Sequence, residues 1–343
     1  MNVRHFSLLC LAAALAFASC ERRSEPVWDE PFRAEFALDT LCVVFLHEFA
    51  DPDVYDAIFA RIHEIESRMS AFLPDSDISR INASAGIEPV QVHDDVFMVI
   101  KRALRYAEIS DGAFDPSIGP LASLWNIMGE NPSVPSQAQI DAVLPLVNWR
   151  YVELDPQTRS VFLRQPGMAL DLGGIAKGYA ADEALAIIRE AGINRALIDL
   201  GGDVITFGVK ADRTPWRVGL QAPYGDRGSI FGIISGWDMT VVTSGVYERF
   251  FTYNGRNYHH LFSPFDGHPA RTGLLSATVV AEVSMDADAL STAIFVLGYE
   301  RGRALIESLD GVEAVFVFED MSVRKTPGLD FRLTDNNFRL LTD

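Results

Sequence analysis

The chain has 343 residues and 48% of them are hydrophobic, so it can bury a large core as one big domain or as two lobes. Its 47 acidic side chains outnumber its 29 basic ones, which gives a formal net charge of -18. Such an acidic chain is a poor candidate for binding nucleic acid. An anionic substrate would depend on local cations or on a metal ion.

The N-terminus has the organisation of an export signal. Arg4 and His5 precede an apolar run at 6–17, which ends at Ala18-Ser19-Cys20 before polar residues follow. The run is too short for a comfortable membrane span, and small residues directly before a cysteine resemble a bacterial lipoprotein cleavage site. An ordinary signal peptide with an incidental cysteine and an uncleaved anchor are the alternatives.

We therefore expect a lipoprotein signal peptide at 1–19, lipidation of Cys20 and a lipidated tether at 20–32. The exported protein would be anchored by its lipid to a bacterial membrane, facing the periplasm or the cell exterior. The remaining thiol, Cys42, lies in an apolar strand-like run, which favours a buried core cysteine and leaves no partner for an intrachain disulfide.

Hydrophobic patterning predicts both helices and strands. After one strand near 33–47, helices are expected over 54–69, 94–109, 176–191, 286–297 and 301–309. Strand-like runs occupy 196–200, 204–207, 216–220, 230–234, 240–243, 277–281 and 312–318. Because the strands occur in clusters and do not alternate with helices, we expect an α+β fold rather than a doubly wound parallel sheet.

The most informative segment is Asp171-Leu172-Gly173-Gly174-Ile175-Ala176-Lys177-Gly178. It places a carboxylate, two adjacent glycines and a lysine at the start of a predicted helix. Free backbone amides at a helix N-terminus bind phosphate oxygens, and glycine lets the backbone approach a ligand closely. The segment lacks the endings of a Walker A loop and of a dinucleotide-binding fingerprint.

A second segment, Ser284 to Ala293, offers oxygen ligands. Asp288 and Thr292 are four residues apart and therefore share one face of the predicted helix. A carboxylate and a hydroxyl suit Mg²⁺, which takes its other ligands from phosphates and water. The alternative is a solvated polar face, but Phe295 lies on the same side and favours a covered face.

Three further segments are compatible either with a catalytic or binding role or with a purely structural one. Residues 68–82 have the pattern of a helix exit followed by a capped turn. Residues 112–121 form a stiff, Pro- and Gly-rich loop that suits a planar ring or simply packs on the core. Residues 243–250 and 258–264 contain hydroxyl side chains, an arginine and two adjacent histidines. One of the histidines could act as a general base, or the pair could simply be the polar end of a strand.

Taken in this order, the segments resemble the ApbE family of FAD:protein FMN transferases, from about residue 34 to about residue 318. The motifs are Met69-Ser70 with 76–82, 112–116 with 119–121, 171–178, 201–203, 243–245 and 287–293. The resemblance implies a two-lobed α+β domain at 33–343, with mixed or antiparallel sheets flanked by helices and an FAD cleft between the lobes.

The resemblance also implies roles for single residues. The implied FAD contacts are Leu38, Phe72, Ala113, Phe114, Asp115, Asp171, Lys177 and Leu261. The implied Mg²⁺ ligands are the backbone carbonyl of Gly174 and the side chains of Asp288 and Thr292. The catalytic base would be His260 or Asp288, and these roles compete because a metal-bound aspartate is a poor base.

Two positions depart from the family pattern. Leu38-Asp39-Thr40 stands where the family has Met-Gly-Thr, and Ser263 replaces an Asp that follows the family histidine.

The implied activity is Mg²⁺-dependent transfer of FMN from FAD to a Thr or Ser hydroxyl, with release of AMP. An Mg²⁺-dependent FAD pyrophosphatase and a non-catalytic FAD-binding lipoprotein are the alternatives. The implied acceptors are exported flavoprotein subunits of membrane electron-transfer complexes.

Overall fold

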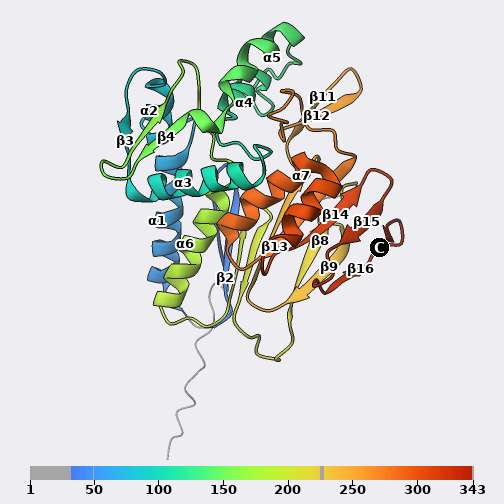
Figure 1. Ribbon diagram of the computed structural model, residues 1–343. Helices are drawn as coiled ribbons and strands as arrows, with labels where there is room; N and C mark the ends of the chain where they lie inside the picture. Colours follow the sequence, from blue (N-terminus) through green and yellow to red (C-terminus); the bar gives the residue numbers. More distant parts are fainter. Residues whose placement is uncertain (1–31, 49, 225–227, 342–343) are drawn as a thin grey trace, which may run out of the picture.

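The computed structural model describes residues 32–48, 50–224 and 228–341. The expected signal peptide, Cys20 and all but the last residue of the expected tether lie outside them. The centre of the molecule is a nine-stranded sheet that is antiparallel except where its last two strands pair (Figure 1). In spatial order the strands are β1 (Phe32–Ala37), β2 (Thr40–Leu46), β6 (Ala196–Leu200), β7 (Asp203–Phe207), β10 (Met239–Gly245), β13 (Leu274–Ala281), β14 (Glu313–Phe318), β15 (Ser322–Lys325) and β17 (Arg339–Leu340).

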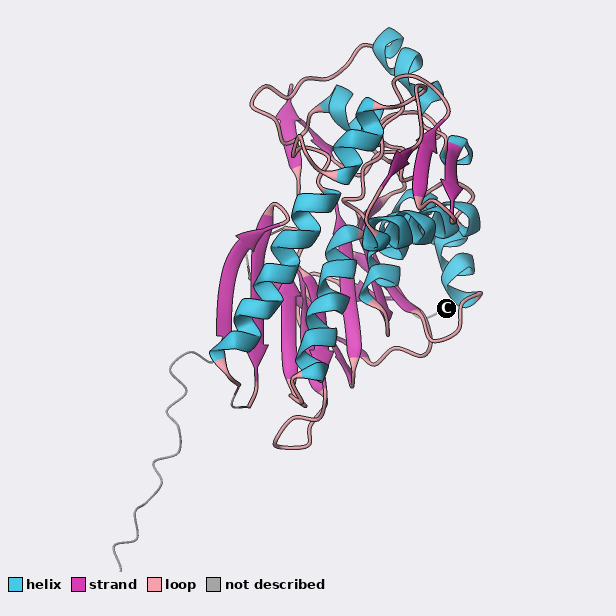
Figure 2. Cartoon of the chain, turned by 90° about the vertical axis from the view of Figure 1, so that its left-hand side faces the viewer, coloured by secondary structure: helices cyan, strands magenta, loops and turns pink. Residues whose placement is uncertain are grey.

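Three helices cover one face of this sheet: α1 (Pro52–Met69), α6 (Ala176–Glu190) and α7 (Ser284–Glu307) (Figure 2). Each buries an apolar stripe, such as Ile58, Ile62 and Ile65 of α1, which explains why the 3.6-residue pattern is so regular. Helix α6 lies between α1 and α7, and α7 crosses β10 and β13.

A smaller sheet of β8 (Trp216–Gln221), β9 (Ile230–Gly236) and β16 (Phe331–Leu333) is linked to the main sheet by a second apolar core. In that core Phe231 of β9 packs in one cluster with Val241 of β10 and Val317 of β14. Strands β10 and β14 therefore support two cores at once.

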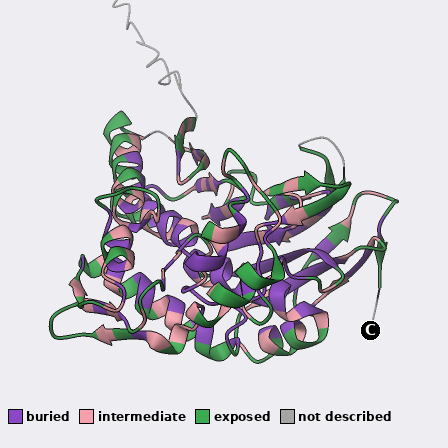
Figure 3. Cartoon of the chain, turned by 90° about the horizontal axis from the view of Figure 1, so that it is seen from above, coloured by how far each residue is buried: buried purple, intermediate pink, exposed green. Residues whose placement is uncertain are grey.

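The second lobe lies beyond one end of the main sheet (Figures 1 and 2). Its elements are α2 (Asp77–Ala83), β3 (Val90–Gln91), α3 (Asp94–Ile109), α4 (Gly119–Trp125), α5 (Gln137–Val143), two short 3₁₀ turns (Leu144–Leu146 and Trp149–Tyr151), β4 (Val152–Asp155), β5 (Ser160–Leu163), β11 (Phe250–Tyr253) and β12 (Arg256–His259). Seen from above, buried residues concentrate where the helices, strands and upper lobe meet (Figure 3).

The predicted α+β class is confirmed, and three predicted helices recur as α1, α3 and α6. The single strand expected near 33–47 is wrong: it is the hairpin β1–β2, turned at Leu38 and Asp39, which both have positive φ. The two helices expected after residue 286 form α7, which is interrupted at the non-helical Gly298. Cys42 is buried as expected. Within the described ranges, no helix is long and apolar enough to cross a membrane.

Candidate functional site

The backbone of the segment that leads into α6 is held by hydrogen bonds from the Asn82 side chain and from the backbone of a third segment. Asn82 of α2 bonds to Leu170 twice, accepting from its amide at 2.7 Å and donating to its carbonyl at 3.0 Å. The amide of Asp171 donates to the carbonyl of Pro116 at 2.8 Å, and its carboxylate accepts from the amide of Gly173 at 2.8 Å. Three motifs far apart in sequence therefore meet at the N-terminus of α6.

Lys177, in the first turn of α6, lies between two buried carboxylates. Its Nζ is 2.7 Å from Asp203 Oδ2 and 3.2 and 3.3 Å from the two oxygens of Asp288. Burial alone would lower the pKa of Lys177, but both carboxylates raise it, so the amine stays cationic. Burial and the Asp288 charge raise the pKa of Asp203 to about 7 although Lys177 opposes this. When Asp203 is ionised, the group has excess negative charge, which favours a further cation.

Helices α6 and α7 cross closely and fix the position of Asp288. A Cβ on Gly178 would lie 2.3 Å from the carbonyl oxygen of Ser284, and the Gly178 amide donates to Asp288 Oδ2 at 3.0 Å. The carboxylate of Asp182 accepts from the amides of Ser284 and Met285 at 2.8 and 2.9 Å. A residue of α6 thereby caps α7, whose own N-cap residue provides no side-chain bond.

Thr292 lies one turn beyond Asp288, at a junction with Gly174 and Phe114. A Cβ on Gly174 would lie 3.3 Å from Thr292 Oγ1 and 3.1 Å from the Phe114 ring, so glycine suits this approach. Thr292 Oγ1 is also 3.3 Å from Ser244 Oγ at the end of β10. The sequence prediction that this face of α7 is covered is confirmed, since only 3% of Asp288 is exposed.

These oxygen groups fit Mg²⁺. The ion prefers oxygen ligands and is commonly held by one or two carboxylates plus water and substrate phosphates. Asp288 would supply a carboxylate and Thr292 a hydroxyl, one turn apart on α7, and Gly174, beside Thr292, a backbone carbonyl. Among the described residues no group of three or more His, Cys, Asp or Glu side chains could hold a metal. A site of this composition therefore depends on phosphate oxygens to complete the shell.

The tip of the β1–β2 hairpin lies against the end of α1. The amide of Leu38 donates to Glu66 Oε1 at 2.8 Å, and Arg249 donates to the carbonyl of Asp39 at 3.4 Å. Phe72 follows the end of α1 and is 78% exposed. An exposed aromatic ring is suited to contact with a flat ring system.

The loop before α4 contains three of the predicted FAD contacts, and their surroundings differ from one another. Ala113 and Phe114 are buried, and Phe114 reaches Gly174 as described above. Both oxygens of Asp115 are engaged within the lobe, one by the amide and hydroxyl of Ser117 and the other by the amide of Trp149. Asp115 therefore shapes the loop, and its contact with FAD stays a prediction.

His260 follows β12 and lies near Arg249. Its Nδ1 is 3.2 Å from the Arg249 carbonyl, which can only accept, so Nδ1 carries the proton and Nε2 is free to accept one. Burial, the Arg249 charge and, more weakly, the Lys177 charge lower the pKa of His260 to about 3, so the ring is neutral. Leu261 is buried, and Ser263 closes a turn with His268 and Gly267.

Asp203, Ser244 and Asp182 are the site residues that sequence reasoning did not assign. Asp203 and Ser244 stand in the motifs 201–203 and 243–245, which carried the resemblance without suggesting a role. Only the distances to Lys177 and Thr292 reveal their parts in the site.

A profile of the ApbE family matches residues 38–316. The chain belongs to the ApbE family. It is 38% identical over 339 residues to an FAD:protein FMN transferase of Treponema pallidum, an alignment covering 94% of this chain and 92% of the relative. It is 37% identical over 293 residues to one of Klebsiella pneumoniae, covering 85% and 91%.

Solved structures give the same result. The ApbE protein of Thermotoga maritima matches with a TM-score of 0.77 and 34% identity, covering 89% of this chain and 96% of that one. The flavin transferase ApbE of Vibrio cholerae matches with a TM-score of 0.76 and 26% identity, covering 90% and 97%. The family and fold expected from the motifs are confirmed, while the roles of single residues stay predictions.

Proposed function

We propose that this chain transfers FMN from FAD to a serine or threonine hydroxyl of another protein and releases AMP. The relatives named above support the transfer, since they carry that activity in their names. The observation that carries the proposal is the position of Lys177, held between Asp203 and Asp288 at a glycine-rich helix start. A cation beside oxygen ligands matches the pyrophosphate of FAD, which is the group to be cleaved.

In this proposal the flavin nucleotide lies between the lobes. The FAD contacts are Leu38 and Phe72 at the end of α1, the loop residues Ala113, Phe114 and Asp115, and Asp171, Lys177 and Leu261. Asp288, Thr292 and the Gly174 carbonyl would hold Mg²⁺, which when bound supplies neutralisation of charge on the pyrophosphate. The convergence of Gly174, Thr292 and Phe114 supports this arrangement.

The reaction forms one phosphoester and breaks one phosphoanhydride bond. The acceptor oxygen attacks the FMN-side phosphorus, the bond to the AMP phosphate breaks, and AMP leaves. His260 Nε2 is the stronger candidate for the base that takes the hydroxyl proton, because Asp288 is already engaged by Lys177 and the Gly178 amide. Bound pyrophosphate would raise the pKa of His260 and make it a better base.

The test separates this function from the alternatives. The purified protein is incubated with FAD, Mg²⁺ and an acceptor domain that a known transferase modifies, and acceptor mass, AMP and free FMN are measured. Added FMN mass with matching AMP supports the transferase. AMP and free FMN without added mass would indicate a pyrophosphatase. Bound FAD with neither product would indicate a non-catalytic carrier and make Ser263 the residue to change to Asp.

The cellular setting is also a proposal. The apolar run before Cys20 supports export and a lipid anchor, with exported flavoprotein subunits of membrane electron-transfer complexes as acceptors.

A further inference from the structure

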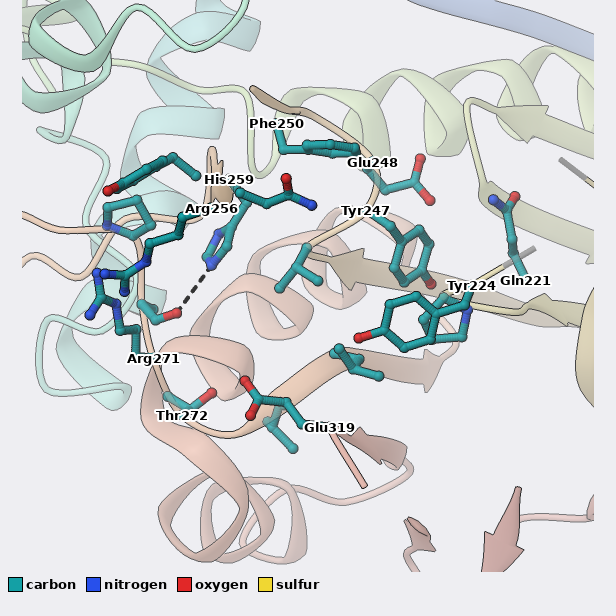
Figure 4. A pocket seen from close by; sticks show the side chains of 18 of the residues that line it. Gln221, Tyr224, Tyr247, Glu248, Phe250, Arg256, His259, Arg271, Thr272 and Glu319 are labelled. Atoms are coloured by element: carbon teal, nitrogen blue, oxygen red, sulfur yellow. Dashed lines mark hydrogen bonds between the residues drawn. The ribbon is translucent and has the colours of Figure 1, made fainter. Parts of the chain in front are cut away.

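A second cavity lies on the other side of β12 from the site just described. Its volume is about 800 Å³, and it is bounded by the end of β8, the β10–β11 connection, β12 and the start of β13 (Figure 4). Its lining includes Tyr224, Tyr247, Phe250, Arg256, Arg271 and Glu319. None of the proposed FAD contacts lines it, so it is distinct from the proposed nucleotide site.

The cavity shares its wall with the reaction site. His259 lines the cavity, where its Nε2 bonds to the Ala270 carbonyl at 3.1 Å (Figure 4). The next residue, His260, bonds instead to the Arg249 carbonyl. Ser244 contacts Thr292, and Val246 and Tyr247, which follow shortly after it in the chain, line the cavity. The cavity wall is therefore formed by residues adjacent in the chain to the proposed base and to Ser244.

The lining has the chemistry of a protein-binding surface. Tyrosine and arginine are enriched among the residues that dominate protein interfaces. Figure 4 shows Tyr224 and Tyr247 near each other on one side, with Arg256 and Arg271 together on the other. In an acidic protein, neither arginine forms an ion pair with a carboxylate of the described residues; Arg256 lies over the Tyr258 ring at 5.4 Å. Two carboxylates, Glu248 and Glu319, also line the cavity, and Figure 4 shows both lying away from Arg256 and Arg271. The arginine side of the cavity is therefore complementary to a carboxylate.

We propose that this cavity docks a carboxylate-bearing segment of the acceptor protein and so presents the accepting hydroxyl to the reaction site. The inference rests on the proposed function and adds to it the place and charge of the acceptor. Tyr224 and Tyr247 contact the segment, and Arg256 and Arg271 bind its carboxylate. FAD binding does not involve these residues.

The test uses the acceptor domain of the preceding experiment, labelled and titrated with the full protein in EDTA. The variant Arg256→Glu/Arg271→Glu should weaken acceptor binding at least about tenfold and raise the acceptor KM similarly, with the Kd for FAD unchanged within about twofold. The variant Arg256→Gln/Arg271→Gln removes the positive charges without adding negative ones. It therefore shows how much of the effect is loss of attraction to the acceptor carboxylate and how much is repulsion by the new glutamates. Arg332→Glu, an exposed β16 position outside the cavity, is the matched control, and thermal unfolding checks that each variant folds.

A second measurement identifies the carboxylate. Changing the Asp and Glu residues beside the accepting hydroxyl to Asn and Gln should weaken binding to the wild-type protein but cause little further loss with the double-Gln variant, because the two changes remove the same interaction. Fully additive losses, or unchanged acceptor affinity in the double-Glu variant, would overturn the docking proposal. A wild-type protein that binds the domain with this arginine dependence but transfers no FMN would contradict the proposed function alone.

Discussion

A Cβ atom on Gly178 of α6 would lie only 2.3 Å from the carbonyl oxygen of Ser284 at the start of α7. Because the obstacle is backbone, Gly178→Ala must push the helices apart, and we expect a loss of about 1–3 kcal/mol in the free energy of unfolding. Asp288 would move with α7, so FMN transfer should fall as well. Urea unfolding measures the first effect, with the exposed Glu190→Ala at the end of α6 as the control. Unchanged stability would show that the crossing is looser than described.

Removing the Lys177 cation from between its two carboxylates should lower the free energy of unfolding more than Gly178→Ala does. Lys177→Met leaves Asp203 and Asp288 buried and unpaired, so we expect about 3–5 kcal/mol of destabilisation and loss of FMN transfer. Adding Asp203→Asn to this variant removes one of the stranded charges and should restore part of the stability without restoring transfer. If the double variant is no more stable than the single one, the ion pair does not govern folding here.

Asp288→Ala tests one of the two carboxylates that flank Lys177. It removes a proposed Mg²⁺ ligand and the acceptor of the Gly178 amide, so Mg²⁺-dependent turnover should disappear. Intact-mass analysis of the acceptor over a range of Mg²⁺ concentrations is the measurement. Normal turnover in this variant would remove Asp288 from the site.

Leu38 combines a strained backbone with a proposed contact to FAD. Its φ is 53°, a conformation that leucine adopts at a cost and that asparagine tolerates. Leu38→Asn should therefore stabilise the fold by about 1 kcal/mol while weakening FAD binding. Calorimetric Tm and FAD Kd are measured together. Asp39→Gly, at the neighbouring positive φ of 57°, should raise Tm with little effect on FAD and serves as the control.

Stability should fall in mild acid because of His259 and, by the same reasoning, His260, whose pKa is lowered by burial to about 3. His259 is tested here because it lies outside the proposed catalytic group. Burial lowers its pKa to about 4 although the Ala270 carbonyl bond opposes this, whereas the unfolded residue titrates near pH 6.5. The unfolded state therefore binds more protons between these pH values, and stability is lost as the pH falls through that window. The contribution is on the order of 2–3 kcal/mol by pH 4. His259→Gln should flatten the dependence of unfolding free energy on pH, and an unaltered slope would assign the effect to other groups.

Anchoring is tested at Cys20. Cys20→Ala removes the proposed lipid attachment, so the mature protein should no longer stay in the membrane fraction by its lipid. Metabolic labelling with a fatty acid and cell fractionation give independent readouts. Continued labelling in the variant would place the lipid elsewhere.

Local patterns predicted α1, α3 and α6 because each carries one continuous apolar stripe, whereas the short helices α2, α4 and α5 were not predicted. The hairpin tip was missed because Leu38 and Asp39 are not the glycine or asparagine that usually announce such a turn. The pairing of Asp288 with Thr292 was readable from helical spacing alone. Asp203 was not, because its partner Lys177 lies 26 residues away and on a different element. The cavity at Arg256 and Arg271 was equally invisible, since it arises from the packing of separate segments.

The capping of α7 by Asp182 also has a consequence for the order of biosynthesis. The groups around Lys177 come from segments between Leu38 and Thr292, and the first turn of α7 obtains its cap only after α6 is in place. A nascent chain that ends before α7 lacks Asp288 and Thr292 and has only part of the nucleotide site. The proposed nucleotide site is therefore complete only after α7 has been synthesised as far as Thr292.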